Sequence, residues 1–555
     1  MKNWTKSDQP SIRKVNSLQA DLKIPDFICS LLIQRDINSL DKAKNFFRPK
    51  LDSLHDPYLM KDMEKAVDRV NKGKKEKILI IGDYDVDGTT STSMLYAYFK
   101  QREFDVLYYI PDRYKEGYGV SLESIDYADE NSVKLIITVD CGIKAVNEVK
   151  YANSKGIDVI VCDHHLPDVD LPKAHSVLNP KQLDCRYPFK DLCGCGIAYK
   201  LITAHNIKSA NKLNIRSLLD FVALATISDM MPLIDENRVM VFHGLNEINN
   251  NPRLGLRNFL KSINKVDESK ISFNIGPRIN AAGRMKNGKI IVDLLTEEDA
   301  NKANSLSNEV EYLNLKRRSI EKKVYENVIK KINNTKYSNI IYGQNFSTGV
   351  LGIVASRLIE KSYKPTIIIT DFDENLLTGS VRSVSGFDVY GALIKCEKFL
   401  YQFGGHKFAA GIKIEKSKLN AFIEHFEKTV QESVDGIMFE RNYKYDIEVP
   451  FSELTVKNVK LISRMSPFGL ENRRPVFRAD NCTIIDDLKF VGKESQVIKS
   501  YILDSFNTKL PFISFSKKDE FINLKSSINI LFTVSINSYS ETDQVEIIIK
   551  EISSN

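Results

Sequence analysis

The chain lacks the long apolar runs that mark membrane-spanning and exported proteins. No segment approaches the roughly 18 consecutive apolar residues that a membrane-spanning helix requires. The first ten residues, MKNWTKSDQP, contain no apolar core of the kind that a signal peptide needs. From these absences we expect a cytoplasmic protein that does not bind a membrane.

Cysteine is sparse as well, and the cysteines that are present are scattered. There are 8 in 555 residues, and only Cys193 and Cys195 form a tight pair, which no second pair matches. A structural zinc site usually combines two such pairs, and disulfide frameworks belong mainly to short secreted chains. We therefore expect reduced thiols and no zinc site.

A strong excess of charge of one sign is the third missing feature. The 79 Lys and Arg residues nearly balance the 72 Asp and Glu residues, which leaves a net charge of +7. This balance is compatible with nucleic-acid binding but does not indicate it alone. A content of 43% hydrophobic and 27% charged residues is typical of a soluble globular protein, and the length suggests several domains.

The sequence does contain a dense group of acidic residues after one apolar segment. Residues 77–81 (KILII) are rich in β-branched side chains, which predicts a strand buried on both faces. Asp83, Asp85 and Asp87 follow at alternate positions, before Gly88 and a predicted helix. Carboxylates crowded at one strand end repel each other, and divalent cations with oxygen ligands usually relieve that repulsion. For this segment alone, a solvated acidic loop is the alternative.

Two more apolar segments end in acidic or histidine side chains. The segment VKLIITVD ends at Asp140, and the segment IDVIVCDHH ends with Asp163, His164 and His165. A predicted helix lies between them, so the two strands should be parallel. Because the carboxyl ends of parallel strands meet at one edge of a sheet, we expect the side chains of all these segments to lie together.

Two further residues are candidates for the same edge. Asp229 ends residues 217–229, an almost uniformly apolar segment that predicts a buried helix. The helix dipole disfavours a carboxylate at a helix C-terminus, and a metal ligand would tolerate that mismatch. Arg113 follows a predicted strand at residues 105–110. Its guanidinium could bind a phosphate through two parallel hydrogen bonds, and a solvated surface arginine is the alternative.

Several of these segments resemble known motifs. GDYDVDG, TVDCG and Asp163-His164-His165 resemble the first three motifs of the DHH phosphoesterase superfamily, and Asp229 matches its fourth. The flanking segments are similar to those of the RecJ family, bacterial 5′→3′ exonucleases specific for single-stranded DNA. The resemblance covers nearly the whole chain. It implies two-metal hydrolysis of phosphodiesters that releases 5′-mononucleotides, in DNA recombination and repair.

The resemblance also implies a role for each residue of the predicted catalytic site. The side chains that correspond to ligands of two Mn²⁺ or Mg²⁺ ions are Asp83, Asp85, Asp140, His164 and Asp229. Many carboxylates with few nitrogen ligands favour these ions over zinc. The remaining catalytic candidates, which could orient the ligands or contact phosphate, are Asp87, Asp163 and His165.

Substrate contacts are implied in the same way. Arg278, Asn280 and Arg284 lie in FNIGPRINAAGRM, which resembles a further RecJ motif, although an inter-domain salt bridge is the alternative there. The segment GGHKFAAG, with His406, resembles the signature of the DHHA1 domain, the substrate-binding partner of many DHH phosphoesterases. A pocket for the 5′ phosphate of the strand is expected to contain Arg113, Arg278, Ser380 and Arg382.

The expected fold is α/β with several domains. Residues 1–75 predict a helical cap, which in RecJ proteins packs on the catalytic domain. The expected units after it are a parallel-sheet phosphoesterase domain (76–298), a long connecting helix (299–336), a smaller DHHA1-like α/β domain (337–435) and an OB-type β-barrel of five strands (436–555). Such a barrel commonly binds single-stranded nucleic acid.

Two places depart from the RecJ pattern. Phe346-Ser347 stands where RecJ proteins usually carry Trp-His, which puts one substrate contact in question. Glu471 replaces a glycine in a turn of the type PFG-x-GN-x-P, and Asn472 and Arg473 follow it. The expected substrate is single-stranded DNA. The resemblance further suggests a single-strand-binding protein and a RecQ-type helicase as partners.

Other functions remain possible for the same motifs. A DHH phosphodiesterase acting on oligoribonucleotides or cyclic dinucleotides normally lacks both the N-terminal cap and the terminal β domain. A family II pyrophosphatase expects a histidine where Leu79 stands. A non-catalytic scaffold of the Cdc45 type would have lost metal ligands, and none of the expected ligands is lost in this sequence.

Overall fold

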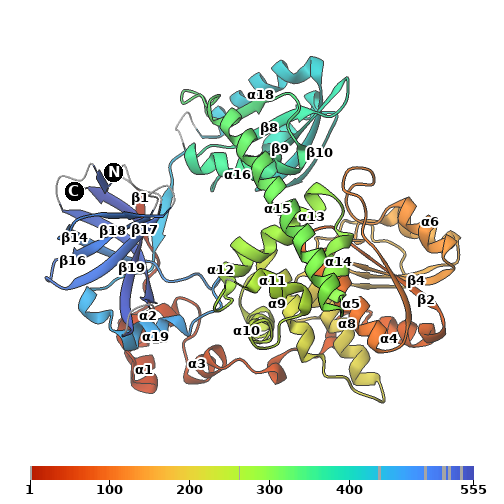
Figure 1. Ribbon diagram of the computed structural model, residues 1–555, viewed down its shortest axis with the longest axis horizontal. Coiled ribbons are helices and arrows are strands. Elements are labelled where there is room, and N and C mark those ends of the chain that lie inside the picture. The colour runs from red at the N-terminus through yellow and green to blue at the C-terminus, as the bar shows by residue number, and fades with distance from the viewer. Residues whose placement is uncertain are drawn as a thin grey trace.

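The computed structural model describes residues 3–261, 263–434, 439–492, 497–515, 521–522, 527–537 and 542–554. Figure 1 shows three lobes: a first α/β domain, a second α/β domain reached through the long helix α15, and a C-terminal β domain. The predicted α/β class with a terminal OB-type barrel is confirmed. Within the described part of the chain, no helix has both the length and the apolarity needed to span a membrane.

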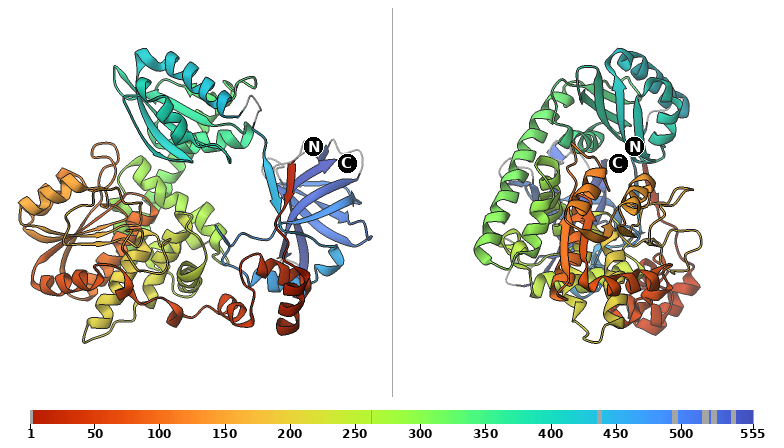
Figure 2. Two further views of the ribbon diagram at one scale, coloured as in Figure 1. Left: turned by 180° about the vertical axis from the view of Figure 1, so that it is seen from behind. Right: turned by 90° about the vertical axis from the view of Figure 1, so that its right-hand side faces the viewer.

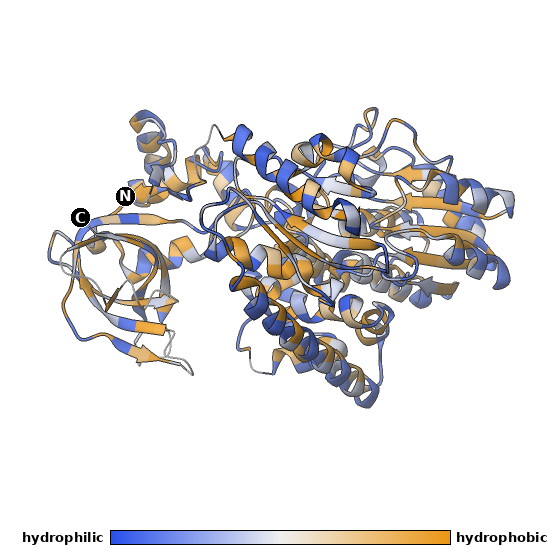
Figure 3. Cartoon of the chain, turned by 90° about the horizontal axis from the view of Figure 1, so that it is seen from above, coloured by the Kyte–Doolittle hydropathy of each residue, from blue (hydrophilic) through white to orange (hydrophobic). Residues whose placement is uncertain are grey.

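The sheet of the first domain is entirely parallel, with the strand order β3-β2-β4-β5-β6. Its strands are β2 (Lys77–Gly82), β3 (Asp105–Tyr109), β4 (Val133–Val139), β5 (Asp158–Cys162) and β6 (Ser176–Leu178). The sequence predicts all of them except β6, which is too short to give an apolar pattern. The central strands are apolar nearly throughout because helices cover both faces of the sheet (Figure 3).

Helices on the two faces of this sheet form two separate cores. The larger core contains residues of α4 (Met63–Lys72), α5 (Val86–Gln101), α8 (Gly194–Lys208) and α9 (Leu219–Ser228), and the smaller contains residues of α6 (Leu122–Glu130) and α7 (Val146–Ser154). The remaining helices before α15 are α10 (Asp235–Asn250), α11 (Leu254–Leu260), α12 (Glu268–Lys270), α13 (Gly276–Met285) and α14 (Lys289–Thr296). As predicted, α9 is buried along almost its whole length, and Asp229 follows directly after it.

The connecting helix α15 covers Ala300–Ile329 and is shorter than predicted. Its side chains Val310, Leu313 and Val328 are buried. The prediction extended the helix to residue 336, and this end is wrong. Asn333 accepts a hydrogen bond from the backbone of Thr335 at 2.9 Å, so its side chain stabilises a turn rather than another helical turn.

The second α/β domain has a five-stranded sheet with the order β10-β11-β9-β8-β7, in which only the β7–β8 pair is parallel. Its elements are β7 (Asn339–Tyr342), α16 (Leu351–Lys361), β8 (Thr366–Asp371), β9 (Leu376–Arg382), α17 (Val389–Lys395), β10 (Gln402–His406), β11 (Ala409–Glu415) and α18 (Leu419–Ser433). Side chains of α17 and α18 share a core with one face of β9 and β11. The opposite face of these strands carries Ser380 and Arg382, which are only half-buried.

The C-terminal β domain is a barrel closed by the pairing of β14 with β16. Its elements are β13 (Ile447–Glu448), α19 (Val456–Ser463), β14 (Phe477–Ile484), β15 (Lys489–Val491), β16 (Val497–Leu503), β17 (Lys509–Phe515), β18 (Ile528–Asn537) and β19 (Gln544–Ser554). The prediction of five strands omits β15, which is very short, and β17. Pro511 lies within β17, and proline weakens any strand pattern.

The N-terminal segment does not pack where the sequence predicts. Strand β1 (Asn3–Lys6) pairs in parallel with β12 (Asn442–Tyr445), in the connection to the β barrel. The helices α1 (Ile12–Leu22), α2 (Asp26–Ile33) and α3 (Leu40–Phe47) share an apolar core with that barrel, as the neighbouring red and blue elements of Figure 2 show. Phe27, for example, packs edge-on against Phe477. The predicted packing into the core of the catalytic domain holds from about Leu51 to α4, while the end of α3 touches that domain through the hydrogen bond from Arg238 to Phe46.

Candidate active site

The loop that follows β2 brings three carboxylates to the edge of the first sheet. Asp85 is the N-cap of α5 and accepts a hydrogen bond from the backbone N–H of Gly88 at 3.0 Å. Asp87 is buried, and its two oxygens accept hydrogen bonds from the backbone N–H groups of Gly194 and Cys195, each at 2.7 Å. The N-terminus of α8 therefore holds Asp87 in place, which a loop of merely solvated acids would not require.

Asp140 follows β4 in a left-handed conformation, with φ of 58°. Such a conformation is unfavourable for a residue other than glycine and persists only where the surroundings impose it. Gly194 supplies part of those surroundings, because a Cβ at this glycine would lie 2.8 Å from the Cα of Asp140. The glycine-rich start of α8 thus allows Asp87 and Asp140 to approach the same helix end.

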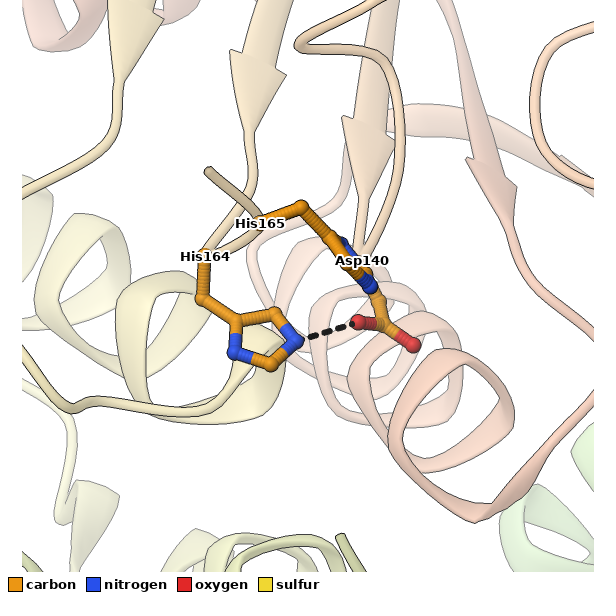
Figure 4. A group of neighbouring side chains, drawn as sticks. All are labelled: Asp140, His164 and His165. Atoms are coloured by element: carbon orange, nitrogen blue, oxygen red, sulfur yellow. Dashed lines mark ion pairs between the residues drawn. The ribbon is translucent and has the colours of Figure 1, made fainter. Parts of the chain in front are cut away.

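Two histidines follow β5 and lie beside Asp140, and Figure 4 shows the ion-pair contact between His164 and Asp140. His164 Nε2 lies 3.1 Å from a carboxylate oxygen of Asp140 and 3.7 Å from one of Asp229. Burial and the neighbouring His165 lower the pKa of His164 to about 3, so its imidazole is neutral, as a metal ligand must be. Asp163 accepts hydrogen bonds from the ring of His165 at 2.7 Å and from the backbone of Ile143 at 2.9 Å.

His165 differs from His164 in the direction of its pKa shift. Burial alone would lower the pKa of His165, but the hydrogen bond to Asp163 and the nearby carboxylates raise it above its usual value. Its carboxylate partner has the opposite shift: burial opposes ionisation of Asp163, yet the contacts with His165 lower its pKa. The hydrogen bond between Asp163 and His165 therefore favours the charged forms of both side chains beside the acidic cluster.

The acidic cluster fits divalent metal ions. Potential ligand atoms lie within 4.8 Å of one another in three groups: Asp83, Asp85 and Asp140; Asp87, His164 and Asp229; and Asp140, His164 and His165. One oxygen of Asp83 is buried without a hydrogen-bond partner. Burial and the neighbouring carboxylates raise the pKa of Asp83 and Asp140 well above the usual value, that of Asp87 to about 6, and that of Asp229 to about 8. Cations between these oxygens would remove both the repulsion and the unmet hydrogen bond.

A second cluster, of arginines, lies at the junction of the two α/β domains. The guanidinium of Arg113 lies 4.9 Å from the ring centre of Tyr84, the residue between Asp83 and Asp85. Burial and the charges of Arg113 and Arg382 lower the pKa of Arg284 to about 10, and burial and Arg113 lower that of Arg382. None of these three arginines forms an ion pair with a carboxylate in the described residues. Unpaired like charges in a half-buried site indicate an anion site.

Hydrogen bonds within each domain, and one between the two domains, hold this arginine cluster together. Arg284 donates a hydrogen bond to the carbonyl oxygen of Gly349 at 3.1 Å, and Tyr114 donates one to the carbonyl oxygen of Arg284 at 2.5 Å. Arg382 donates to the hydroxyl oxygen of Ser380 at 3.2 Å. A Cβ at Gly352, in the first turn of α16, would lie 2.5 Å from the Arg382 guanidinium. The anion site therefore lies beside the N-terminus of a helix, which favours negative charge.

The other predicted substrate residues lie elsewhere. Arg278 pairs with Glu311 of α15 at 2.6 Å, so it serves the salt bridge that the sequence left as the alternative. His406 is exposed at the end of β10, and its ring lies beside Phe408 rather than beside the arginine cluster. Asn280 is half-buried and one helical turn before Arg284. The structure thus joins Arg113, Arg284, Ser380 and Arg382 and leaves Arg278 out of the predicted pocket.

Sequence reasoning missed Tyr118 and Tyr84. The hydroxyl of Tyr118 donates to the carbonyl oxygen of Asp140 at 2.8 Å and lies 3.3 Å from the ring nitrogens of His165. Its ring packs edge-on against Tyr84, which lies under Arg113. Tyrosines therefore connect the acidic cluster with the arginine cluster. For Tyr118 the available signal was the segment Glu116-Gly-Tyr-Gly119. This segment predicts a turn but does not indicate what the tyrosine side chain contacts.

The whole chain matches known sequences. Residues 77–226 match the DHH family, N-terminal domain, residues 333–432 the DHHA1 domain, and residues 445–551 the RecJ OB domain. The single-stranded-DNA-specific exonuclease RecJ of Bacillus subtilis is 34% identical over 98% of this chain and 70% of that protein. RecJ of Haemophilus influenzae is 33% identical over 81% of this chain and 82% of that protein. The chain belongs to the RecJ family.

Solved structures of RecJ proteins agree with this membership. The crystal structure of RecJ in complex with Mn²⁺ from Thermus thermophilus has a TM-score of 0.85 at 23% identity, covering 100% of this chain and 80% of that chain, and shows the shared fold. A crystal structure of exonuclease RecJ bound to manganese has a TM-score of 0.61 at 30% identity, over 70% of this chain and 99% of that chain.

The two departures from the RecJ pattern have local explanations. The ring of Phe346 is half-buried and fills the space above Gly343, where a Cβ would collide with it. Phe346 therefore contributes to the apolar packing between α15 and the second domain. Glu471 has a φ of 60°, the left-handed conformation in which the family usually has glycine. A residue other than glycine adopts this conformation at a cost of about 1 kcal/mol.

Proposed function

We propose that this protein is a metal-dependent exonuclease that degrades single-stranded DNA in the 5′→3′ direction and releases 5′-mononucleotides. The observation that carries the proposal is the juxtaposition of the acidic cluster with the arginine cluster, joined by Tyr84, which lies between Asp83 and Asp85 and under Arg113. The acidic cluster suits metal cations, and the arginine cluster suits a phosphate anion. A terminal nucleotide whose 5′ phosphate lies on the arginines would place its next phosphodiester at the metals.

The predicted ligands are assigned to two Mn²⁺ or Mg²⁺ ions. The proposed ligand set is Asp83, Asp85, Asp140, His164 and Asp229. When bound, such ions lower the pKa of an attacking water and offset charge on the phosphate. Asp87 has both oxygens committed to backbone N–H groups, so we assign it to fixing the ligand loop against α8.

The remaining side chains of the site orient the substrate. His165, held by Asp163 and Tyr118, is positioned to donate a hydrogen bond to a phosphate oxygen. The terminal phosphate would be bound by Arg113, Arg284, Ser380 and Arg382. The unpaired guanidiniums of the three arginines would neutralise its two negative charges at neutral pH. Because the distance between the arginine cluster and the metal ligands is fixed, cleavage would remove one nucleotide at a time from the 5′ end.

The rest of the chain is assigned to binding the strand. The OB-type barrel would contact the DNA beyond the cleaved nucleotide through stacking and charge. We further propose a cytoplasmic role in recombination and repair, beside a single-strand-binding protein and a RecQ-type helicase. These partners follow from the family resemblance alone, and no surface of the chain is assigned to them.

The alternative functions are less well supported. Enzymes acting on oligoribonucleotides or cyclic dinucleotides have no need of the barrel, which matches the RecJ OB domain. A non-catalytic scaffold would not need a preserved ligand set with a raised pKa at Asp229 and a lowered pKa at His164.

Degradation of end-labelled DNA tests the proposal. Single strands labelled at either end, and blunt duplexes of the same sequence, would be incubated with the full-length protein and Mn²⁺, Mg²⁺ or a chelator. We expect mononucleotides from the 5′ end of single strands only when metal is present. Release from the 3′ end, rapid digestion of blunt duplex, or preference for a cyclic dinucleotide would contradict the proposal.

A further inference from the structure

Residues 465–474, here called the docking loop, join the C-terminal β domain to the first domain at the segment that carries Asp229. This loop contains the PFG-like turn that the sequence singles out and that the catalytic proposal does not use. The segment it meets, residues 229–238, is here called the tether; it runs from Asp229, at the end of α9, to Arg238, in the first turns of α10.

Arg238 anchors the far end of the tether. It is almost fully buried, and every hydrogen bond of its guanidinium goes to a backbone carbonyl. In the docking loop it donates to Met465 at 3.0 Å, Ser466 at 3.0 Å and Pro467 at 3.3 Å. It also donates to Phe46 at 3.0 Å and lies 3.7 Å from the centre of that ring. One side chain therefore binds the first domain, the N-terminal segment and the β domain.

The docking loop also contacts the middle of the tether. The backbone N–H of Leu233 donates to the carbonyl oxygen of Leu470 at 2.8 Å. A Cβ at Gly469 would lie 2.7 Å from a methyl group of Leu233, so the loop packs directly on this side chain. Inside the loop, buried Asn472 donates to the carbonyls of Met465 and Pro467 at 2.9 and 2.8 Å, which gives the loop a fixed shape.

The tether itself has an unfavourable backbone. Met230, directly after Asp229, has a φ of 56°, and Asp235 has a φ of 46°. Non-glycine residues in this region cost about 1 kcal/mol or more each, and they persist only where neighbouring structure imposes the conformation. Within the first domain, Asn237 helps by donating to the carbonyl of Pro232 at 3.0 Å. The other contacts described above come from the β domain and, at Phe46, from the N-terminal segment. Hydrogen bonds within the first domain, from Met231 to the carbonyl oxygen of Thr226 at 3.0 Å and from Asn237 to that of Asp191 at 2.6 Å, also restrain the tether.

We propose that the docking loop is a positioning element for Asp229, so that attachment of the C-terminal β domain sets the metal affinity of the acidic cluster. The inference rests on the proposed role of Asp229 as a metal ligand. In physical terms, the loop holds a strained turn that starts at the ligand. Without the loop the turn relaxes, and the carboxylate moves away from His164, whose ring nitrogen now lies 3.7 Å from it.

Mn²⁺ binding to the full-length protein without DNA tests this inference, by titration calorimetry or by electron paramagnetic resonance of free Mn²⁺. Arg238→Lys keeps the charge but cannot reach all the loop carbonyls, and we expect about tenfold weaker Mn²⁺ binding, as for residues that orient metal ligands. Gly469→Ala displaces Leu233 and should weaken binding in the same direction, by less. Nuclease activity of both variants should recover at saturating Mn²⁺, because the ligands themselves are intact.

Arg474→Gln is the matched control. Arg474 belongs to the docking loop but pairs with Glu268, outside the tether, at 3.0 Å. This variant should lower the melting temperature without changing the Mn²⁺ affinity. If Arg238→Lys does not fold, Gly469→Ala decides the question.

Three results would overturn the inference. They are an unchanged Mn²⁺ affinity in folded Gly469→Ala protein, an equal loss of affinity in Arg474→Gln protein, and no recovery of activity at high Mn²⁺. If the unmodified protein binds no Mn²⁺, the proposed metal site itself is wrong. Mn²⁺ binding by the unmodified protein therefore distinguishes an error in the proposed metal site from an error in the proposed role of the docking loop.

Discussion

The acidic and the arginine clusters are built in opposite ways. The carboxylates come from strand ends and one helix end of a single domain, where backbone N–H groups of α8 and the left-handed turn at Asp140 fix them. The arginines come from the loop after β3, from α13 and from β9, so they belong to two domains, which the hydrogen bond from Arg284 to Gly349 joins at this point. The proposed chemistry thus depends on one sheet edge, whereas the proposed recognition of the strand end depends on how two domains meet.

Breaking the acidic cluster should have the largest effect. Asp85→Asn keeps the helix cap, because asparagine also accepts a hydrogen bond from Gly88, but it removes a metal charge. We expect nuclease activity to fall by roughly 10²–10³-fold or more. The metal-free variant should melt at a higher temperature than the unmodified protein, since one of several repelling charges is gone. Normal turnover by the purified variant would refute the assignment of Asp85.

Disrupting the arginine cluster should slow the degradation of 5′-phosphorylated strands much more than that of strands with a 5′ hydroxyl. Arg382→Gln should slow degradation of 5′-phosphorylated strands by about 10-fold or more, the usual value of a hydrogen bond to a charged group, and strands with a 5′ hydroxyl much less. Arg278→Gln is the control, because Arg278 is already paired with Glu311 and should affect both substrates equally. Equal losses on both ends in the Arg382 variant would assign Arg382 to the domain interface instead.

The acidic cluster, unlike the arginine cluster, should make the stability of the metal-free protein depend on pH. In the folded protein the pKa of Asp87 is raised to about 6 and that of Asp229 to about 8, while in the unfolded chain both lie near 4. A raised carboxyl pKa means that the unfolded state loses its proton first, so stability falls as the pH rises from about 4 through these values. We expect the metal-free melting temperature to decrease between pH 5 and pH 8, and saturating Mn²⁺ to reverse most of that decrease. An equal stabilisation by Mn²⁺ at both pH values would contradict this account.

The acidic cluster could be predicted from sequence, and the arginine cluster only in part. Strand patterns and the rule that parallel strands end at one edge are local, and they were sufficient to bring Asp83, Asp140 and His164 together. The arginine cluster depends on the orientation of a second domain, which no local pattern encodes. This is why Arg278 was placed with Arg382, although its ion-pair partner, Glu311, lies on the connecting helix.

The position of the N-terminal segment was unpredictable for a related reason. Its amphipathic helices show that they need an apolar partner but not which one. Strand β1 pairs with β12, about 440 residues away in the chain. The docking loop shows the same limit, because its contacts with Arg238 involve backbone carbonyls, which carry no sequence signature. Sequence patterns therefore predicted the elements well and the contacts between domains poorly.

The smallest expected effect concerns the tyrosines that link the two clusters. Tyr118→Phe keeps the ring against Tyr84 but removes the hydroxyl that bonds to Asp140 and His165. Because one neutral hydrogen bond contributes about 1 kcal/mol, we expect kcat to fall by about 5-fold, with little change in KM for DNA or in Mn²⁺ affinity. Tyr114→Phe is the matched control, since among the described residues its hydroxyl bonds only to Arg284, at the domain junction. That variant should weaken binding of 5′-phosphorylated ends and leave kcat nearly unchanged. If both variants lower kcat alike, the tyrosines support one continuous site, and the separation between chemistry and end recognition argued above is wrong.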